Sequence, residues 1–118
     1  MNTDMWTWLI PFGLIAAWLL FKRLSQVSPA EAQRLVGEGA KLIDVRSPAE
    51  YATGHLPGSI NVPVNELGVR AAELGPKDEP KVIYCASGTR SAIARSMLKG
   101  QGFKQVFNLG AMSRWRSA

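Results

Sequence analysis

The chain has 118 residues, a length that suits one domain, and it carries 14 basic and nine acidic side chains for a net charge of +5. The segment through Arg23 contains Asp4, Lys22 and Arg23. The residues after it carry twelve basic and eight acidic side chains, a net charge of +4. No clustered Lys/Arg stripe accompanies this modest excess, which argues against a nucleic-acid partner and favours a small anionic substrate or anionic lipid headgroups. One cysteine excludes an internal disulfide.

The first two dozen residues have a composition of their own. No charged residue occurs from Met5 to Phe21, and such a run would form roughly 26 Å of helix, against a bilayer hydrocarbon core of about 30 Å. Tryptophans lie toward its two ends, where indole rings favour the membrane interface. We therefore expect residues 1–4 to be a tail and residues 5–23 to be a single transmembrane helix with its basic stop.

Three other interpretations fit this run less well. A cleaved signal peptide begins with a positive region, whereas here Asp4 precedes the run and Lys22-Arg23 follow it. An interfacial helix would show a polar face, and a buried core helix would need a larger domain to cover it. Because the basic residues follow the helix, the sequence predicts a single-pass membrane protein with its N-terminus outside, the globular part in the cytoplasm and the lipid bilayer as a partner.

Residues 24–118 begin with two helix-start signals. Ser28-Pro29-Ala30-Glu31 and Ser47-Pro48-Ala49-Glu50 each place a hydroxyl at the N-cap, proline at the first helical position and glutamate at the third. Between them, the apolar run Leu42–Val45 is typical of a buried strand that closes at Arg46. A strand followed by a capped helix is the repeating unit of an α/β domain.

The same alternation continues to the end of the chain. The second helix is expected to stop near Thr53, and a turn at Leu56–Gly58 precedes the segment Ser59–Pro63. The remaining elements are expected in this order: a helical stretch at Asn65–Leu74, a strand at Val82–Cys85, a helix that ends at Gly100, and a strand at Val106-Phe107. This pattern predicts a mainly parallel sheet covered on both faces, with functional loops at the carboxyl ends of its strands.

Cys85 lies at one such strand end, directly before a helical pattern. Inward backbone N–H groups and the positive end of a helix dipole stabilise a thiolate there, so Cys85 is a candidate nucleophile. The alternative, a buried core cysteine, stays open. The nucleophile is favoured by the loop that follows, whose members supply amides, hydroxyls, unusual backbone angles and a cation: Ala86, Ser87, Gly88, Thr89 and Arg90.

Four stretches of the sequence, in this order along the chain, match motifs of a known family. They are Leu42–Arg46 with Glu50-Tyr51, Gly54–Pro63, Tyr84–Arg90 followed by Ser91-Ala92, and Gly110–Trp115. Together they resemble the rhodanese family of single-domain thiosulfate or persulfide sulfurtransferases, from about Val27 to Trp115. The resemblance implies an α/β fold for residues 24–118, with a central, mainly parallel sheet of about five strands flanked by helices.

The resemblance also implies a chemistry for Cys85. A small anionic sulfur donor, thiosulfate or a persulfide, would leave a sulfane sulfur on Cys85 as a persulfide, which the loop amides from Ala86 to Arg90 would hold. An external thiol, cyanide or a protein acceptor would then remove it, because the chain has no second cysteine. Four residues separate Cys85 from Arg90, as in the sulfurtransferases of this fold, whereas the related phosphatases use one more.

The other candidate site residues support this chemistry. Arg90 would orient the loop or attract the donor, and Arg46 would do the same or pair with Glu50, with a plain surface ion pair as the alternative. Asp44 is expected to fix loop groups by hydrogen bonds. His55 resembles the structural turn histidine of the family, with a general-base role as the alternative. The pattern calls for no cofactor and no metal, because it has no cluster of ligands.

Two functions follow from the sequence. The first is a membrane-anchored sulfurtransferase that turns over thiosulfate. The second is a non-turnover sulfur carrier or docking module for a membrane protein partner. Both require a reactive Cys85, and they differ in the rate of turnover without a partner.

Overall fold

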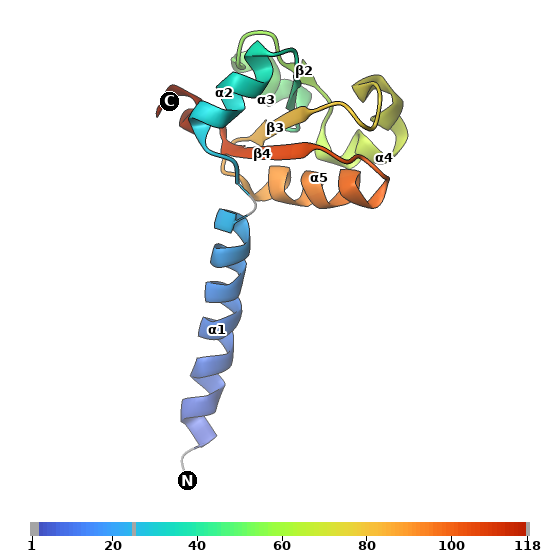
Figure 1. The fold of residues 1–118 in the computed structure, drawn as a ribbon. Coiled ribbons are helices and arrows are strands. Elements are labelled where there is room, and N and C mark those ends of the chain that lie inside the picture. The colour runs from blue at the N-terminus through green and yellow to red at the C-terminus, as the bar shows by residue number, and fades with distance from the viewer. Residues whose placement is uncertain (1–2, 25, 118) are drawn as a thin grey trace.

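The computed structural model describes residues 3–24 and 26–117, which form a long N-terminal helix and an α/β domain (Figure 1). The helix α1 (Thr3–Leu24) extends away from the domain as a separate rod. Its side chains from Trp6 to Phe21 are exposed. The helix that the sequence predicts is therefore present, with Pro11 inside it.

The predicted membrane crossing is wrong. Within the described part of the chain, no helix combines the length and the apolarity that a bilayer crossing needs. The uncharged run Met5–Phe21 has only seventeen residues, and Trp6, Trp8, Pro11 and Gly13 lower its mean hydropathy. The single-pass topology, the outside N-terminus, the cytoplasmic placement and the bilayer as a partner all depended on that crossing and are withdrawn with it.

Residues 3–24 and 26–117 contain a sheet of four strands, all paired in parallel, in the order β2-β1-β3-β4. The strands are β1 (Lys41–Asp44), β2 (Ile60–Asn61), β3 (Lys81–Cys85) and β4 (Val106–Ala111). The expectation of about five strands is corrected to four. Among the described residues, pairing beyond β4 consists of one isolated bridge between Gln26 and Asn108. Ser28 caps the next helix only two residues after Gln26 and so ends the extended segment.

Helices cover both faces of the sheet (Figure 1). They are α2 (Pro29–Gly37), α3 (Pro48–Thr53), α4 (Leu67–Arg70) between the 3-10 turns η1 (Val64–Glu66) and η2 (Ala71–Leu74), α5 (Thr89–Gly100) and the 3-10 segment η3 (Met112–Ser117). Both predicted helix starts are confirmed. Ser28 Oγ accepts from Glu31 N, and Ser47 forms a complete capping box with Glu50.

Two apolar clusters hold these layers together. On one face, strand residues such as Ile83 pack against Leu98 of α5 and Leu67 of α4. On the other face, Tyr84 and its neighbours pack against Leu35 of α2. Since all the strands are parallel, their carboxyl ends meet at one edge of the sheet, and the register pairs Cys85 with Ala111 at that edge.

Candidate active site

Cys85 is the last residue of β3, and its sulfur lies inside a ring of hydrogen-bond donors. The sulfur atom Sγ accepts from the backbone N–H of Gly88 at 2.9 Å and of Ser91 at 3.4 Å. The residue itself is fully buried, with 0 % of its surface exposed. Two N–H dipoles directed at one sulfur stabilise its anionic form, which is the nucleophilic form.

The backbone N–H groups can donate to the sulfur because no side chain caps the start of α5. Gly88 occupies the N-cap with φ 96°, a left-handed conformation that L side chains rarely adopt. That conformation turns the loop back, so the free amides at the helix start reach Cys85. Ser91 completes the arrangement, because its hydroxyl accepts from the thiol at 3.4 Å and donates to the Gly88 carbonyl at 3.1 Å.

The outer side of the loop is open to solvent. Ala86 and Ser87 are exposed, Thr89 is half-buried, and Gly88 is buried. The loop therefore covers Cys85 with residues that are themselves partly exposed.

Arg90 and Glu50 form an ion pair that ties this loop to α3. Arg90 Nη1 and Nη2 donate to Glu50 Oε1 and Oε2 at 2.6 and 2.9 Å, and both side chains are about one-third exposed, at 34 % and 36 %. The Arg90 guanidinium lowers the pKa of Glu50 to about 2, helped by the backbone N–H of Ser47. In return, Glu50 raises the pKa of Arg90, and Cys85 adds to that effect. Because both terminal nitrogens of Arg90 are engaged, this geometry orients the loop.

Arg46 pairs with Asp44, and Glu50 is engaged by Arg90 instead. Arg46 Nη2 lies 2.7 Å from Asp44 Oδ2, and Nε lies 3.0 Å from the same oxygen, in a pair that is almost completely buried. Arg46 Nη2 also donates to the Gly54 carbonyl at 2.6 Å. The Asp44 carboxylate raises the pKa of Arg46. Asp44 thus holds Arg46, and Arg46 in turn holds the Gly54 carbonyl.

His55 lies on the outer surface of the Gly54–Pro57 turn. Its ring stacks on Tyr51 with centroids 3.7 Å apart, and its Nδ1 lies 2.9 Å from the Tyr51 carbonyl oxygen. Because a carbonyl only accepts, Nδ1 carries the proton in this contact. The contacts of Cys85 Sγ are to Gly88 and Ser91, so this arrangement supports the structural role of His55 and gives no support to a general-base role. Among the described residues, no three His, Cys, Asp or Glu side chains come together as metal ligands would.

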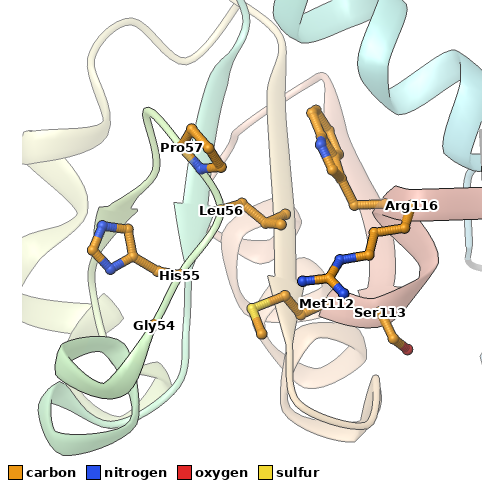
Figure 2. A pocket seen from close by; sticks show the side chains of 8 residues that line it. Gly54, His55, Leu56, Pro57, Met112, Ser113 and Arg116 are labelled. Atoms are coloured by element: carbon orange, nitrogen blue, oxygen red, sulfur yellow. The ribbon is translucent and has the colours of Figure 1, made fainter.

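A cavity of about 700 Å³ opens at the carboxyl edge of the sheet (Figure 2). One wall is the Gly54–Pro57 turn, and the other is formed by Met112, Ser113, Trp115 and Arg116 of η3. None of the loop residues 86–90 lines it. Met112 directly follows Ala111, the register partner of Cys85, but Cys85 belongs to the apolar cluster on one face of the sheet and Leu56, Met112 and Trp115 belong to the cluster on the other.

Some residues of the site were not assigned a role from the sequence. Ser91 hydrogen-bonds the sulfur, and Asn61 Nδ2 donates to the carbonyls of Asp44 and Arg46. The position of Ser91 in the first turn of a helix that follows a cysteine loop was the available signal. No sequence signal pointed to Asn61, because its contacts depend on the pairing of β1 with β2.

Comparison with known proteins gives a consistent family assignment. The family profile for the rhodanese-like domain matches residues 28–118. A sulfurtransferase of Allochromatium vinosum is 41% identical over 90 residues, covering 75% of this chain and 83% of that protein. Thiosulfate sulfurtransferase GlpE of Pseudomonas entomophila is 37% identical over 100 residues, covering 82% and 86%.

A solved structure agrees with these matches. The human single-domain sulfurtransferase TSTD1 superposes with a TM-score of 0.68 at 30% identity, covering 78% of this chain and 95% of that one. The resemblance inferred from the sequence motifs is thus confirmed at the level of the family. The chain belongs to the rhodanese-like domain family and is a sulfurtransferase of the rhodanese type.

Proposed function

We propose that this chain moves sulfane sulfur through a persulfide on Cys85, from thiosulfate or a persulfide donor to an external thiol, cyanide or a protein acceptor. The observation that carries the proposal is the pair of backbone N–H groups on Sγ at the uncapped start of α5. The N–H groups that stabilise the thiolate can also stabilise the negative charge on the outer sulfur of the persulfide.

The first half-reaction is a displacement at sulfur. The Cys85 thiolate attacks the outer sulfur of thiosulfate, a new S–S bond forms, and the S–S bond of thiosulfate breaks. Sulfite leaves with the electron pair of that bond, and Cys85 keeps the sulfur as a persulfide anion. No proton moves once the thiolate exists, which suits a sulfur whose described contacts are amides and one hydroxyl.

The second half-reaction returns the enzyme to its starting state. An acceptor thiolate or cyanide attacks the outer sulfur of the persulfide, and the Cys85 thiolate leaves. The loop N–H groups stabilise that leaving thiolate as they did the nucleophile. Because the chain has no second cysteine, the acceptor comes from outside.

The two arginines are positioning residues in this proposal. Arg90 fixes the loop against α3 through Glu50, and its residual positive field favours an anionic donor. Arg46, buried with Asp44, holds the Gly54 carbonyl and so fixes the turn that forms one wall of the cavity.

The proposal is tested by intact mass spectrometry after incubation with thiosulfate. We expect the wild type to gain the mass of one sulfur and to lose it on addition of cyanide with formation of thiocyanate. Cys85→Ser is expected to gain none and to lose turnover by at least about a thousandfold, because the attacking thiolate is gone. A sulfur adduct that persists in Cys85→Ser, or a wild type that gains no sulfur from either donor class, contradicts the proposal.

The complete burial of Cys85 favours a second candidate, a sulfur carrier that is loaded only when a protein partner moves the loop. The two candidates differ in how freely small reagents reach the sulfur. Rapid alkylation of Cys85 by iodoacetamide, together with turnover of thiosulfate and cyanide by the isolated protein, supports the enzyme. Loading by a protein persulfide but not by thiosulfate supports the carrier.

A further inference from the structure

The helix α1 carries an apolar surface that the α/β domain leaves uncovered. Every side chain from Trp6 to Phe21 is exposed. Of the large apolar side chains that are exposed in the described residues, all but Ile60, Val69 and Ile93 belong to α1. Monomeric domains rarely expose so continuous an apolar patch, and a patch of this extent marks an interaction surface.

One face of α1 changes from large to small side chains along its length. Gly13, Ala16 and Ala17 lie on this face, because residues three and four positions apart are neighbours on a helix. Leu9 and Ile10 lie on the same face one turn before Gly13, and they are 52 % and 62 % exposed. A Cβ added to Gly13 would meet no atom within 4 Å. The face is therefore open, and it is bulky before Gly13 and shallow after it.

The two ends of α1 carry opposite charges. Asp4 lies near the start of the helix and Lys22 and Arg23 lie near its end, with no charged residue between them. A parallel second copy would bring like charges together at both ends, whereas an antiparallel copy sets the acidic end of each helix level with the basic end of the other. Because Asp4 and Lys22 are each nine positions from Gly13, such a pair has Gly13 at its centre.

The sizes of the side chains agree with the register that the charges define. In an antiparallel pair centred on Gly13, Leu9 and Ile10 of one copy lie level with Ala16 and Ala17 of the other. The bulky part of each face then lies against the shallow part of the other, as close packing of two helices requires. The charges and the sizes belong to different residues, so they support the same pairing independently.

The antiparallel direction also keeps the two α/β domains apart. With 22 residues, α1 is about 33 Å long, and Figure 1 shows the domain beyond its C-terminal end. The residues after Arg23 carry a net charge of +4 in each copy. An antiparallel pair places these like-charged domains at opposite ends of the two helices, where their repulsion is weakest.

We infer that α1 is a self-association element and that it pairs antiparallel with α1 of a second copy of this chain, centred on Gly13. The pair is isologous, because each copy contributes the same face to it. No residue of the Cys85 loop takes part, so the pairing can fail while the proposed function holds, and the reverse is equally true.

Cysteine cross-linking of the full chain tests the direction of the pair. Leu9→Cys and Ala16→Cys are made as separate proteins, both with Cys85→Ser so that no other thiol reacts. After mixing and mild oxidation, we expect disulfides between the two proteins and few within either protein alone, because the antiparallel register sets these positions side by side. Disulfides that form within each protein alone and not between the two indicate a parallel pair and contradict the inference.

A second pair of cysteines is the matched control for the face. Trp8 and Trp18 lie level with each other in the same register, since each is five positions from Gly13, but they lie on the opposite face of α1. A mixture of Trp8→Cys and Trp18→Cys, again with Cys85→Ser, is expected to form few disulfides. Cross-linking as fast as that of the first mixture would show contact without a preferred face and would contradict the pairing.

Reversal of the charges at one end tests the register by its effect on affinity. Lys22→Glu with Arg23→Glu is expected to raise the dissociation constant of the pair about tenfold, because both ends then become acidic. Addition of Asp4→Lys restores opposite ends and is expected to restore the affinity. Lys99→Glu with Lys104→Glu makes the same change in net charge on the exposed surface of the domain and is expected to leave the affinity nearly unchanged.

Analytical ultracentrifugation of the full chain measures these dissociation constants. A wild type that stays monomeric contradicts the inference, and so does an assembly whose affinity ignores the charge reversal, since the contact would then be non-specific. Monomers recovered on phosphatidylcholine vesicles, without cross-linked pairs, contradict it as well, because lipid and not a second copy would cover α1.

Discussion

The helices α3 and α5 both begin just beyond the carboxyl end of a parallel strand, yet different chemistry satisfies their first turns. At α3, the Ser47 hydroxyl and the Glu50 carboxylate accept each other's backbone N–H groups. At α5, no side chain caps the helix, and the N–H groups of Gly88 and Ser91 donate to the sulfur of Cys85. The first turn of α3 has its N–H donors satisfied by its own side chains, whereas the N–H groups at the start of α5 donate to the sulfur and are affected by every change in its charge.

Gly88→Ala is expected to break the α5 arrangement with the largest effect. A Cβ at φ 96° costs about 1–2 kcal/mol, and the loop relieves this strain by moving its N–H away from Cys85. We expect persulfide formation from thiosulfate to slow by about a hundredfold, the loss typical of one removed anion donor. Stopped-flow measurement of sulfite release gives the rate, and thermal unfolding gives the stability.

Gly58→Ala is the matched control for this prediction. Gly58 also has a positive φ, 80°, and an added Cβ there would meet no atom within 4 Å. It lies in a turn outside the catalytic loop. We expect a similar loss of thermal stability with an unchanged rate of sulfur transfer. Equal loss of rate in both variants would mean that stability, and not the N–H of Gly88, limits the reaction.

The contrast between α3 and α5 also shows how much could be predicted from the sequence. Helix caps are local, so Ser47 and Glu50 could be assigned from four consecutive residues, and the loop around Cys85 could be found because its glycine and its helix follow within a few positions. In the structure, Ser47 is the N-cap of α3 and Gly88 is the N-cap of α5. Local geometry of this kind is encoded by neighbouring residues and needs no knowledge of the sheet.

Contacts between distant segments were less accessible to sequence reasoning. The pairing of Arg90 with Glu50 joins residues forty positions apart, and it depends on β3 lying beside β1. The sequence offered Glu50 as a partner for Arg46 instead, because the two are close along the chain, but Asp44 lies two residues from Arg46 and holds it. The number of strands also depends on contacts between distant segments: the resemblance implied about five, whereas the described residues form four strands and one isolated bridge between Gln26 and Asn108.

Glu50→Gln is expected to have a smaller effect, because it weakens the link between α3 and α5 and leaves both helix starts in place. The pKa of Glu50 in the folded protein is about 2, below the ordinary value of 4.5. The folded state thus binds fewer protons than the unfolded state, so the stabilisation by the Arg90 pair is fully present above pH 4.5 and is lost as the pH falls toward 2. We expect the stability difference between wild type and variant to be constant above that range and to shrink within it.

Urea unfolding across this pH range measures the difference. Arg90→Gln is expected to show the same pH dependence, and the double variant is expected to lose no more stability than either single variant, because each change removes the same pair. A stability difference that does not change with pH would show that Glu50 acts through its capping box and not through its charge.

Ser47→Ala is expected to have the smallest effect, and on stability alone. The change removes the acceptor for the Glu50 N–H and costs about 1 kcal/mol, while the Ser47 backbone N–H still donates to the Glu50 carboxylate. Glu50 therefore keeps its contact with Arg90, and the sulfur keeps its donors. Urea midpoints are expected to fall by the same amount as in Ser28→Ala, which removes the equivalent cap of α2.

The rate of persulfide formation in Ser47→Ala shows whether the start of α3 affects the reaction. An unchanged rate means that α3 supports the site only by being folded, which is the expected contrast with α5. A rate that falls more in Ser47→Ala than in Ser28→Ala, at equal loss of stability, would mean that the start of α3 controls the loop through Glu50. The two helix starts would then form one coupled unit, and the cap of α3 would belong to the catalytic machinery.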